Sequence, residues 1–464
     1  MWGKIWGGVI VAGALAVSGC GGDSSDRPAK KEAASAAKAY FVDNAVIGLR
    51  YKCGNGGFKL TGEQGLLVCQ PGQTVSFYVG DILLGQATMA SGTGFVTPQT
   101  LATVDGLLDE NVMANLARLL VSLDLDQNPD NGIQIDPAAH VTTGLVLDFS
   151  LDPASFATAV SGALNLLTQG VDGGPFALVG ESEANEHLSF GLLLSNAGFY
   201  EGTVQFDAET SRKVAFLVSR EGAAYGTNMT VDGYYSAAAF NEEAGPFSPL
   251  GEGATAEFMI DGGTGATYYL NSSLSGGVAT GSHPEAEYPT FQATRKVVFE
   301  PLADFNLVEA LDSLTPLAVD LGGERTFVLD YSDFQIFGML YSAWGGTPSS
   351  NDPANDIGYW FINYADMVSA KDGVIRLLAL TTNGYLVDMR MDFNGEVPAL
   401  NAKWRHLHDG TSGTSTTYTA NVEYDTDYGP VAPPPGEEEL MLMSADKRKT
   451  GLRKGEPVSS GRFQ

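Results

Sequence analysis

Short segments of alternating apolar and polar residues, separated by glycine- and asparagine-rich turns, run through most of this chain. They restrict it to a mainly β architecture. The 464 residues include 57 glycines, and threonine, valine, tyrosine and phenylalanine recur between the turn clusters. This composition favours strands joined by many turns over long helices. We therefore predict a mainly β fold with a small helical segment.

The first twenty residues have the pattern of an export signal. Lys4 supplies a positive charge, and the apolar run from Ile5 to Val17 is too short to span a bilayer. The run closes on Val-Ser-Gly-Cys, ending at Cys20, and this closing sequence resembles the lipobox of bacterial lipoproteins. The resemblance implies that residues 1–20 are a lipoprotein signal, cleaved before Cys20. It also implies that Cys20 carries acyl chains such as palmitate.

The residues after Cys20 extend this interpretation. Gly21 stands where an aspartate would retain such a lipoprotein in the inner membrane, so the resemblance implies the outer membrane. The protein would face the periplasm or the cell surface. Residues 21–38 are small, polar and without an apolar face, which is typical of a flexible tether.

Two further cysteines lie in a segment that alternates as strands. Cys53 ends one candidate strand and Cys69 ends another, within a small β-sandwich-like module predicted over 39–105. In an oxidising compartment the two cysteines are expected to pair, although two free thiols remain the alternative. Their disulfide would contribute roughly 3 kcal/mol in the chain-entropy model. A module of this size is marginal alone, which gives the disulfide a structural purpose.

A helical connector is predicted over 106–175. Leucines and valines fall on one stripe between Asn111 and Leu123, with Asp109 as a candidate N-cap. A second helix is expected from Asp152, with Pro153 at its first position. These helices should pack on the β-module or on each other.

A larger β-rich domain is predicted over 188–428, either as one unit or split near residue 320 by a short helix. Candidate strands recur between glycine- and asparagine-rich loops, and either a sandwich or an up-and-down barrel fits. Aromatic residues concentrate in its second half. They could form a ligand-binding surface for sugars or apolar molecules, although most such residues fill β cores. The candidates are Tyr341, Trp344, Trp360 and Trp404.

The strongest local motif is LDLDQNPDNGIQID, which follows the first predicted helix. Its oxygen-bearing side chains alternate along the chain, as in loops that surround Ca²⁺. A helix C-terminus carries partial negative charge, so acidic residues there favour a compensating cation. The motif departs from an EF-hand, and a helix-ending turn held by hydrogen bonds from the Asp and Asn side chains is the alternative. The candidate calcium ligands are Asp124, Asp126, Asn128, Asp130 and Asp136.

The same stretch carries a wider resemblance. A short β-domain with a cysteine pair, the helix and turn ARLLVSLDLDQNPDNGIQI, and a lipobox together resemble a recurring module of proteobacterial surface lipoproteins and adhesin-like proteins. The resemblance covers residues 40–170, and Gln127 replaces the glycine usual in the motif. It implies a module of the cell envelope and transfers no catalytic residues.

The charge distribution separates the body from the C-terminal residues. The chain has 55 acidic and 26 basic residues, a net charge of −29, which argues against nucleic-acid binding. Residues 429–464 are predicted to be disordered, with a Pro- and Glu-rich linker before a basic tail at 447–464. A solvated tail is one interpretation, and docking onto anionic lipid or onto the acidic body is the other.

No catalytic motif is recognisable, and we assign no catalytic residue. The G-x-S-x-G, H-E-x-x-H, Walker and dinucleotide-binding patterns are all missing from the sequence. We therefore predict a membrane-anchored envelope lipoprotein with a binding or scaffolding role, whose partner would be an envelope protein or a glycan. The alternatives are an envelope hydrolase acting on polysaccharide or peptide, and a carrier of apolar small molecules. Both would use the 188–428 domain.

Overall fold

The computed structural model describes most of the chain from residue 36 to residue 420. Cys20, Trp360 and the 429–464 segment lie outside the described residues, as do the predicted signal and nearly all of the tether. The described ranges are 36–233, 235–240, 255–263, 265–302, 305–315, 317–322, 325–330, 339–345, 361–381 and 383–420.

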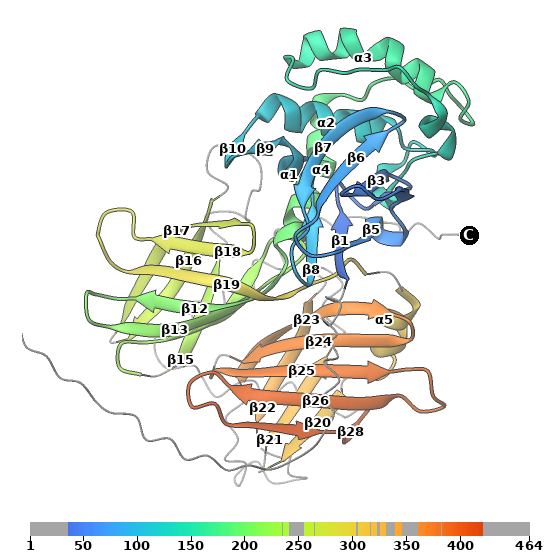
Figure 1. Ribbon diagram of the computed structural model, residues 1–464. Helices are drawn as coiled ribbons and strands as arrows, with labels where there is room; N and C mark the ends of the chain where they lie inside the picture. Colours follow the sequence, from blue (N-terminus) through green and yellow to red (C-terminus); the bar gives the residue numbers. More distant parts are fainter. Residues whose placement is uncertain are drawn as a thin grey trace, which may run out of the picture. The chain divides into compact units, whose positions relative to one another are not determined.

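The N-terminal region contains a three-stranded and a four-stranded sheet, together with the two-stranded pairs β9–β10 and β2–β11 (Figure 1). One sheet has the order β5-β1-β8 and the other β4-β3-β6-β7, and strand β1 pairs antiparallel with β5 and parallel with β8. The strands of this region are β1 (Ala37–Phe41), β2 (Val46–Ile47), β3 (Arg50–Cys53), β4 (Phe58–Leu60), β5 (Leu66–Cys69), β6 (Thr74–Val79), β7 (Ile82–Thr88), β8 (Thr93–Val96), β9 (Thr103–Val104), β10 (Leu107–Leu108) and β11 (Ile133–Gln134).

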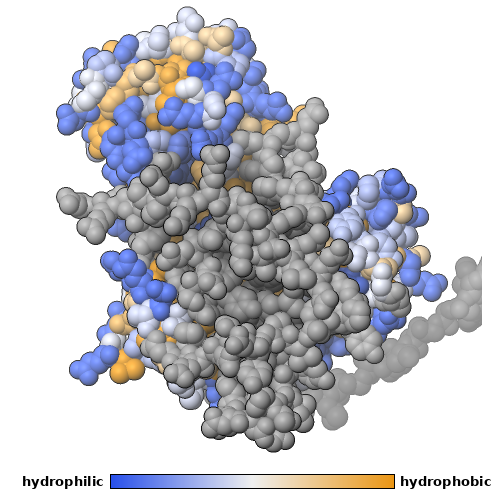
Figure 2. All heavy atoms as spheres, turned by 180° about the vertical axis from the view of Figure 1, so that it is seen from behind, coloured by the Kyte–Doolittle hydropathy of each residue, from blue (hydrophilic) through white to orange (hydrophobic). Residues whose placement is uncertain are grey.

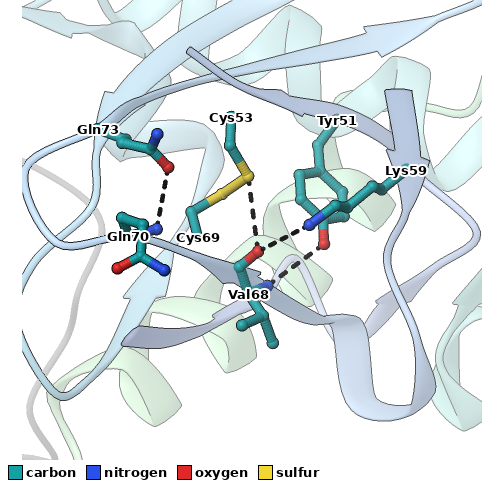
Figure 3. Close-up of a disulfide and its surroundings, with 7 residues drawn as sticks. All are labelled: Tyr51, Cys53, Lys59, Val68, Cys69, Gln70 and Gln73. Atoms are coloured by element: carbon teal, nitrogen blue, oxygen red, sulfur yellow. Dashed lines mark hydrogen bonds between the residues drawn. A yellow bond between two sulfur atoms is a disulfide. The ribbon is translucent and has the colours of Figure 1, made fainter. Parts of the chain in front are cut away.

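The predicted disulfide is present and links the two sheets (Figure 3). Cys53 ends β3 and Cys69 ends β5, and their Cα atoms are 5.8 Å apart. Beside it, the Tyr51 hydroxyl accepts a hydrogen bond from the Val68 N–H at 3.3 Å, which is a second link between β3 and β5. The disulfide therefore joins the two sheets of the module covalently.

Helices follow the sheets along the chain and share their core. Asp109 caps α2 by accepting the Val112 N–H at 3.1 Å, and Asp152 caps α3 with Pro153 at the first position, both as predicted. Figure 2 shows patches of apolar surface among hydrophilic residues. Leu166 of α3 is 45% exposed. The helical elements are α1 (Pro98–Ala102), η1 (Glu63–Gly65), α2 (Glu110–Ser122), η2 (Pro129–Asn131), η3 (Pro137–Val141), α3 (Pro153–Thr168) and α4 (Glu181–Asn196).

Helix α4 extends the helical stretch past the predicted limit at residue 175, into residues that the sequence assigned to the β-rich domain. Ala184, Leu188 and Leu192 recur every four residues and are buried, which is the pattern of one helical face. Gly180 precedes the helix and Glu181 lies in its first turn, where a negative charge is favourable. The first strand of the next region begins only at Gly198.

Eight strands then form a closed antiparallel barrel in simple up-and-down order, with β19 pairing back to β12 (Figure 1). Along β17, buried and exposed residues alternate, so one face of the strand lines the interior. The interior is packed with aromatic rings from Tyr200, Phe216, Phe258 and Phe291, with centroids 4.9 to 6.1 Å apart. The strands are β12 (Gly198–Gln205), β13 (Ser211–Val218), β14 (Ala224–Met229), β15 (Tyr235–Phe240), β16 (Thr255–Gly263), β17 (Ala266–Ser275), β18 (Val278–Ser282) and β19 (Thr290–Val298).

A second antiparallel sheet of nine strands follows the helix α5 (Phe305–Asp312), which lies where a split of the β-rich domain was expected. Its order is β27-β26-β25-β24-β23-β22-β21-β20-β28, so consecutive strands again lie side by side apart from the last. The strands are β20 (Leu317–Gly322), β21 (Arg325–Asp330), β22 (Met339–Gly345), β23 (Phe361–Lys371), β24 (Val374–Thr381), β25 (Tyr385–Asp392), β26 (Ala399–His406), β27 (Ser412–Ser415) and β28 (Tyr418–Thr419).

The barrel and the second sheet share an apolar cluster. Phe199 and Leu217 of the barrel lie in one buried cluster with Leu378 and Leu380 of β24. Strand β13 is consequently buried on both faces from Val214 to Val218, with alternate residues in the barrel core and in the shared cluster. This double burial accounts for its continuous apolar run VAFLV.

Polar contacts accompany this cluster. Arg220, in the turn between β13 and β14, donates to the carboxylate of Asp366 at 3.0 Å and to the main-chain oxygens of Glu300 and Met367. The Glu300 side chain in turn accepts from the Tyr40 hydroxyl at 2.9 Å. One connected set of contacts therefore links β1, the barrel and the second sheet.

Candidate functional site

The LDLDQNPDNGIQID motif forms a compact turn between α2 and β11. Asp124 is fully buried at the end of α2, and its two carboxylate oxygens accept the main-chain N–H groups of Asn128 and Gln134, each at 2.8 Å. Burial is the main reason that the pKa of Asp124 rises, to about 7. The carboxylate thus satisfies the Gln134 amide, which the turn would otherwise leave unpaired, and shares the Asn128 amide with Asp126.

The other predicted calcium ligands also bind groups of the protein. Asp126 accepts the Asn128 N–H at 3.0 Å and the Asn131 side-chain amide at 2.9 Å. Asp136 lies apart from them as the N-cap of η3, where it accepts the Ala138 N–H at 2.7 Å.

These contacts match the hydrogen-bonded turn that the sequence left as the alternative to calcium. The structure describes the main chain of Asp130 but not its side chain. Within the described ranges, no three or more His, Cys, Asp and Glu side chains form a group suited to a metal ion. Calcium binding remains a prediction.

The turn also fastens the helical connector to the β-module. The Asn44 side-chain amide donates to the main-chain oxygen of Pro129 at 2.6 Å, and β11 pairs in parallel with β2 through Ile133 and Val46. The motif therefore has a structural role that accounts for most of its polar side chains.

A buried carboxyl group that sequence reasoning missed lies next to this turn. Asp43 is fully buried between Val42 and Ala45, and neither of its carboxylate oxygens has a hydrogen-bond partner among the described residues. Helix α4 covers it closely, since a Cβ added at Gly191 would stand 3.1 Å from the Asp43 Cα. Burial raises the pKa of Asp43 to about 8. In sequence, an Asp-Asn pair indicates an exposed turn, so no local signal could have revealed this burial.

The four aromatic candidates do not form a described binding surface. Trp404 is 7% exposed, and its indole N–H donates to the main-chain oxygen of Leu321 at 3.2 Å. The Trp404 ring therefore packs in the core of the second sheet, and the ligand-binding role of the four residues remains a prediction. Tyr341 and Trp344 lie on β22, but their side chains and the whole of Trp360 lie outside the description.

The β9–β10 hairpin, which Figure 1 shows beside α1 and α2, exposes apolar side chains. Its two-residue turn, Asp105 and Gly106, has positive φ at both positions (52° and 80°), as a type I′ turn requires. Val104 and Leu107 pair across the strands and so share one face, where they are 67% and 78% exposed.

An open groove of about 800 Å³ runs between this hairpin, the end of α1 and the first turn of α2. We call this groove, whose lining residues all lie within 101–112, the hairpin groove. Three exposed carboxylates accompany its apolar residues, and no lysine or arginine occurs between Leu101 and Ala117. The carboxylates belong to Asp105, Asp109 and Glu110.

The sequence contained a signal for this hairpin. The dipeptide Asp-Gly between two short apolar segments is a strong indication of a type I′ turn. The predicted boundary between the β-module (39–105) and the helical connector (106–175) falls inside that turn. It therefore separates the two strands of one hairpin.

Comparison of the chain with family models, with curated proteins and with solved structures finds no match. None of the helices that the structure describes is long and apolar enough to cross a membrane. The candidate functional site therefore rests on the geometry of the chain itself.

Proposed function

We propose that this protein is a lipid-anchored envelope protein with a binding or scaffolding role, held in the outer membrane through Cys20. The lipobox-like sequence ending at Cys20 and the polar tether after it support this proposal. The protein then acts where its N-terminal region can meet other envelope components, on the periplasmic or the outer side.

The observation that carries the binding role is the exposure of Val104 and Leu107 on a hairpin of fixed geometry. Burying apolar side chains against a partner contributes about 25 cal/mol per Å². A short type I′ hairpin supported by α1 and α2 loses little conformational freedom on binding, which favours affinity. The hairpin groove is therefore our candidate contact surface.

The packing of the barrel supports binding through an outer surface over carriage of an apolar molecule inside it. Phe216, Phe258 and Phe291 fill the barrel interior with rings in mutual contact, and all three are buried. An apolar ligand as large as one of these rings would have to displace them to enter the barrel.

The anchor is tested by the intact mass of protein extracted from membranes. We expect a mass increase at Cys20 that corresponds to lipid, together with loss of membrane association in Cys20→Ser. An unmodified Cys20 in the membrane-extracted protein would contradict the anchor.

The binding role is tested by cross-linking capture from envelope fractions, followed by mass spectrometry. We expect a specific envelope protein or glycan with the wild type and its loss from the double variant Val104→Ser, Leu107→Ser. Val397→Ser is the matched control, because Val397 is 73% exposed in the loop between β25 and β26. Equal capture by all three proteins would exclude the hairpin groove as the contact surface.

A further inference from the structure

We propose that the basic C-terminal segment 447–464 of this chain occupies the hairpin groove when no partner is bound. This inference rests on the proposed function, because it takes the groove to be a binding surface. It adds that the 447–464 segment of the same chain is the occupant of that surface.

The groove selects a ligand that is both apolar and cationic. Val104 and Leu107 offer apolar area, and three exposed carboxylates border it with no basic residue between Leu101 and Ala117. An apolar ligand without positive charge would leave Asp105 and Glu110 without a cationic partner, whereas Asp109 already accepts the Val112 N–H as the cap of α2. A purely charged ligand would leave the apolar pair in water.

The 447–464 segment has both properties in its sequence. It carries six basic residues against Glu456 alone, and it also contains Leu452, Val458 and Phe463. The remainder of the chain is strongly acidic, since the whole chain carries −29. In this segment the basic and apolar residues therefore occur together with a single acidic residue.

The chain length between the two elements permits the contact. The structure describes the chain as far as residue 420, and 26 residues separate that point from residue 447. A linker of this length spans up to about 90 Å when extended. Tethering also raises the local concentration of the segment toward the millimolar range, so a weak contact suffices.

Charge argues against the two other occupants. A second copy of this chain would bring its own acidic groove and a net charge of −29 against the first, which is repulsive. A membrane would have to accept Asp105 at the tip of the hairpin, beside Leu107, and anionic headgroups would repel the bordering carboxylates.

The test is site-specific photo-crosslinking in the purified full-length mature chain, with Leu107→p-benzoylphenylalanine as the probe. We expect crosslinks within one chain from position 107 to peptides of 447–464. Val397→p-benzoylphenylalanine is the matched exposed control and should give several-fold less of this product. The product should fall several-fold when the six basic residues are replaced by glutamine, and also in high salt, which screens exposed charges.

A variant with glutamine at the three glutamates 437–439 controls for a general effect of charge changes near the tail, and should crosslink as the wild type does. The proposal is overturned if position 107 gives no tail product, or if the product is unchanged by the glutamine replacements. Crosslinks between two chains, or to lipid in vesicles containing anionic phospholipid, would also overturn it in favour of those occupants.

Failure of this inference is distinguishable from failure of the proposed function. Capture of an envelope partner at position 107 without any tail product would support the proposed function and exclude the 447–464 segment as the occupant of the groove. A tail product in the purified protein, with no partner captured even by the variant whose six basic tail residues are glutamine, would support the intramolecular contact and contradict the binding role.

Discussion

At the scale of single residues, the two buried aspartates of the N-terminal region differ in what they contact. Asp124 accepts two main-chain amides in the turn after α2, whereas Asp43 has no hydrogen-bond partner among the described residues. Both are fully buried, so the difference lies in the polar groups around them. Their substitution should therefore change stability in opposite directions.

We expect Asp43→Asn to stabilise the protein at neutral pH. The folded-state pKa of Asp43, about 8, lies above its ordinary value of 3.8, so ionisation destabilises the fold progressively as the pH rises from about 4 to about 8. An asparagine does not ionise and so avoids this destabilisation. At about 1.4 kcal/mol per pKa unit, the destabilisation by ionised Asp43 at pH 7 is at most about 4 kcal/mol. Thermal unfolding across this pH range should show a Tm difference that widens with pH.

Asp105→Asn, at the exposed hairpin tip, is the control and should leave Tm nearly unchanged. A lower Tm for Asp43→Asn in Ca²⁺, with no change in EDTA, would contradict this account and indicate a cation at Asp43.

Asp124→Ala should destabilise the protein by about 1–3 kcal/mol. It leaves the amide of Gln134 unpaired, and such an unsatisfied group costs about 1–3 kcal/mol, whereas the Asn128 N–H keeps the Asp126 carboxylate as an acceptor. Denaturant titration measures the loss, and Asp126→Ala, at an exposed position of the same turn, should cost less. If the turn is held by these hydrogen bonds alone, the wild-type Tm will be the same in Ca²⁺ and in EDTA.

At the scale of elements, the disulfide and the LDLDQNPDNGIQID turn act on the same small module. The disulfide joins the sheet containing β3 to the sheet containing β5, and the turn joins α2 and β11 to β2. The N-terminal core then includes residues from both sheets and from α2 and α3. The β-module and the helical connector are thus two parts of one packed core.

Removing the disulfide with Cys53→Ser and Cys69→Ser should cost about 3 kcal/mol, since the unfolded chain loses the constraint on its 17-residue loop. Guanidinium unfolding of the double variant, compared with the oxidised wild type, measures this loss. Reduced wild type is a second reference and should resemble the variant. A midpoint equal to that of the oxidised protein would show that the helices alone hold the two sheets together.

At the scale of the whole molecule, the barrel and the second sheet are joined by an apolar cluster with Arg220 at its edge. Arg220 holds the buried carboxylate of Asp366 and two main-chain oxygens. A second ion pair, between Arg405 and Glu201, joins the same two bodies at a more exposed position. The two pairs differ in burial and therefore offer a matched comparison.

Arg220→Gln should destabilise the contact between barrel and sheet by about 3–5 kcal/mol, because it leaves Asp366 buried without its partner. Arg405→Gln should cost less than about 1 kcal/mol, as is usual for exposed pairs. Calorimetry should show a lower Tm, or separate transitions of the two bodies, for Arg220→Gln only. Equal effects of the two variants would mean that the apolar cluster alone carries the contact.

The sequence by itself determined the features that depend on local patterns. Alternation and turn residues indicated the β character and the disulfide-closed module, and the helices capped by Asp109 and Asp152 begin where their capping residues predicted. The acidic turn was recognisable as a motif, and its hydrogen-bonded form was among the alternatives considered. These features are set by interactions among residues that are close in sequence.

Only the tertiary structure decided the features that depend on residues far apart in the chain. Closure of the barrel requires β12 to pair with β19, some ninety residues later, and no local pattern encodes that pairing. The burial of Asp43 under α4 and of Trp404 in the second sheet, and the exposure of Val104 and Leu107, likewise follow from which elements pack together. Periodicity in sequence states which faces are apolar, whereas packing determines which of those faces are covered.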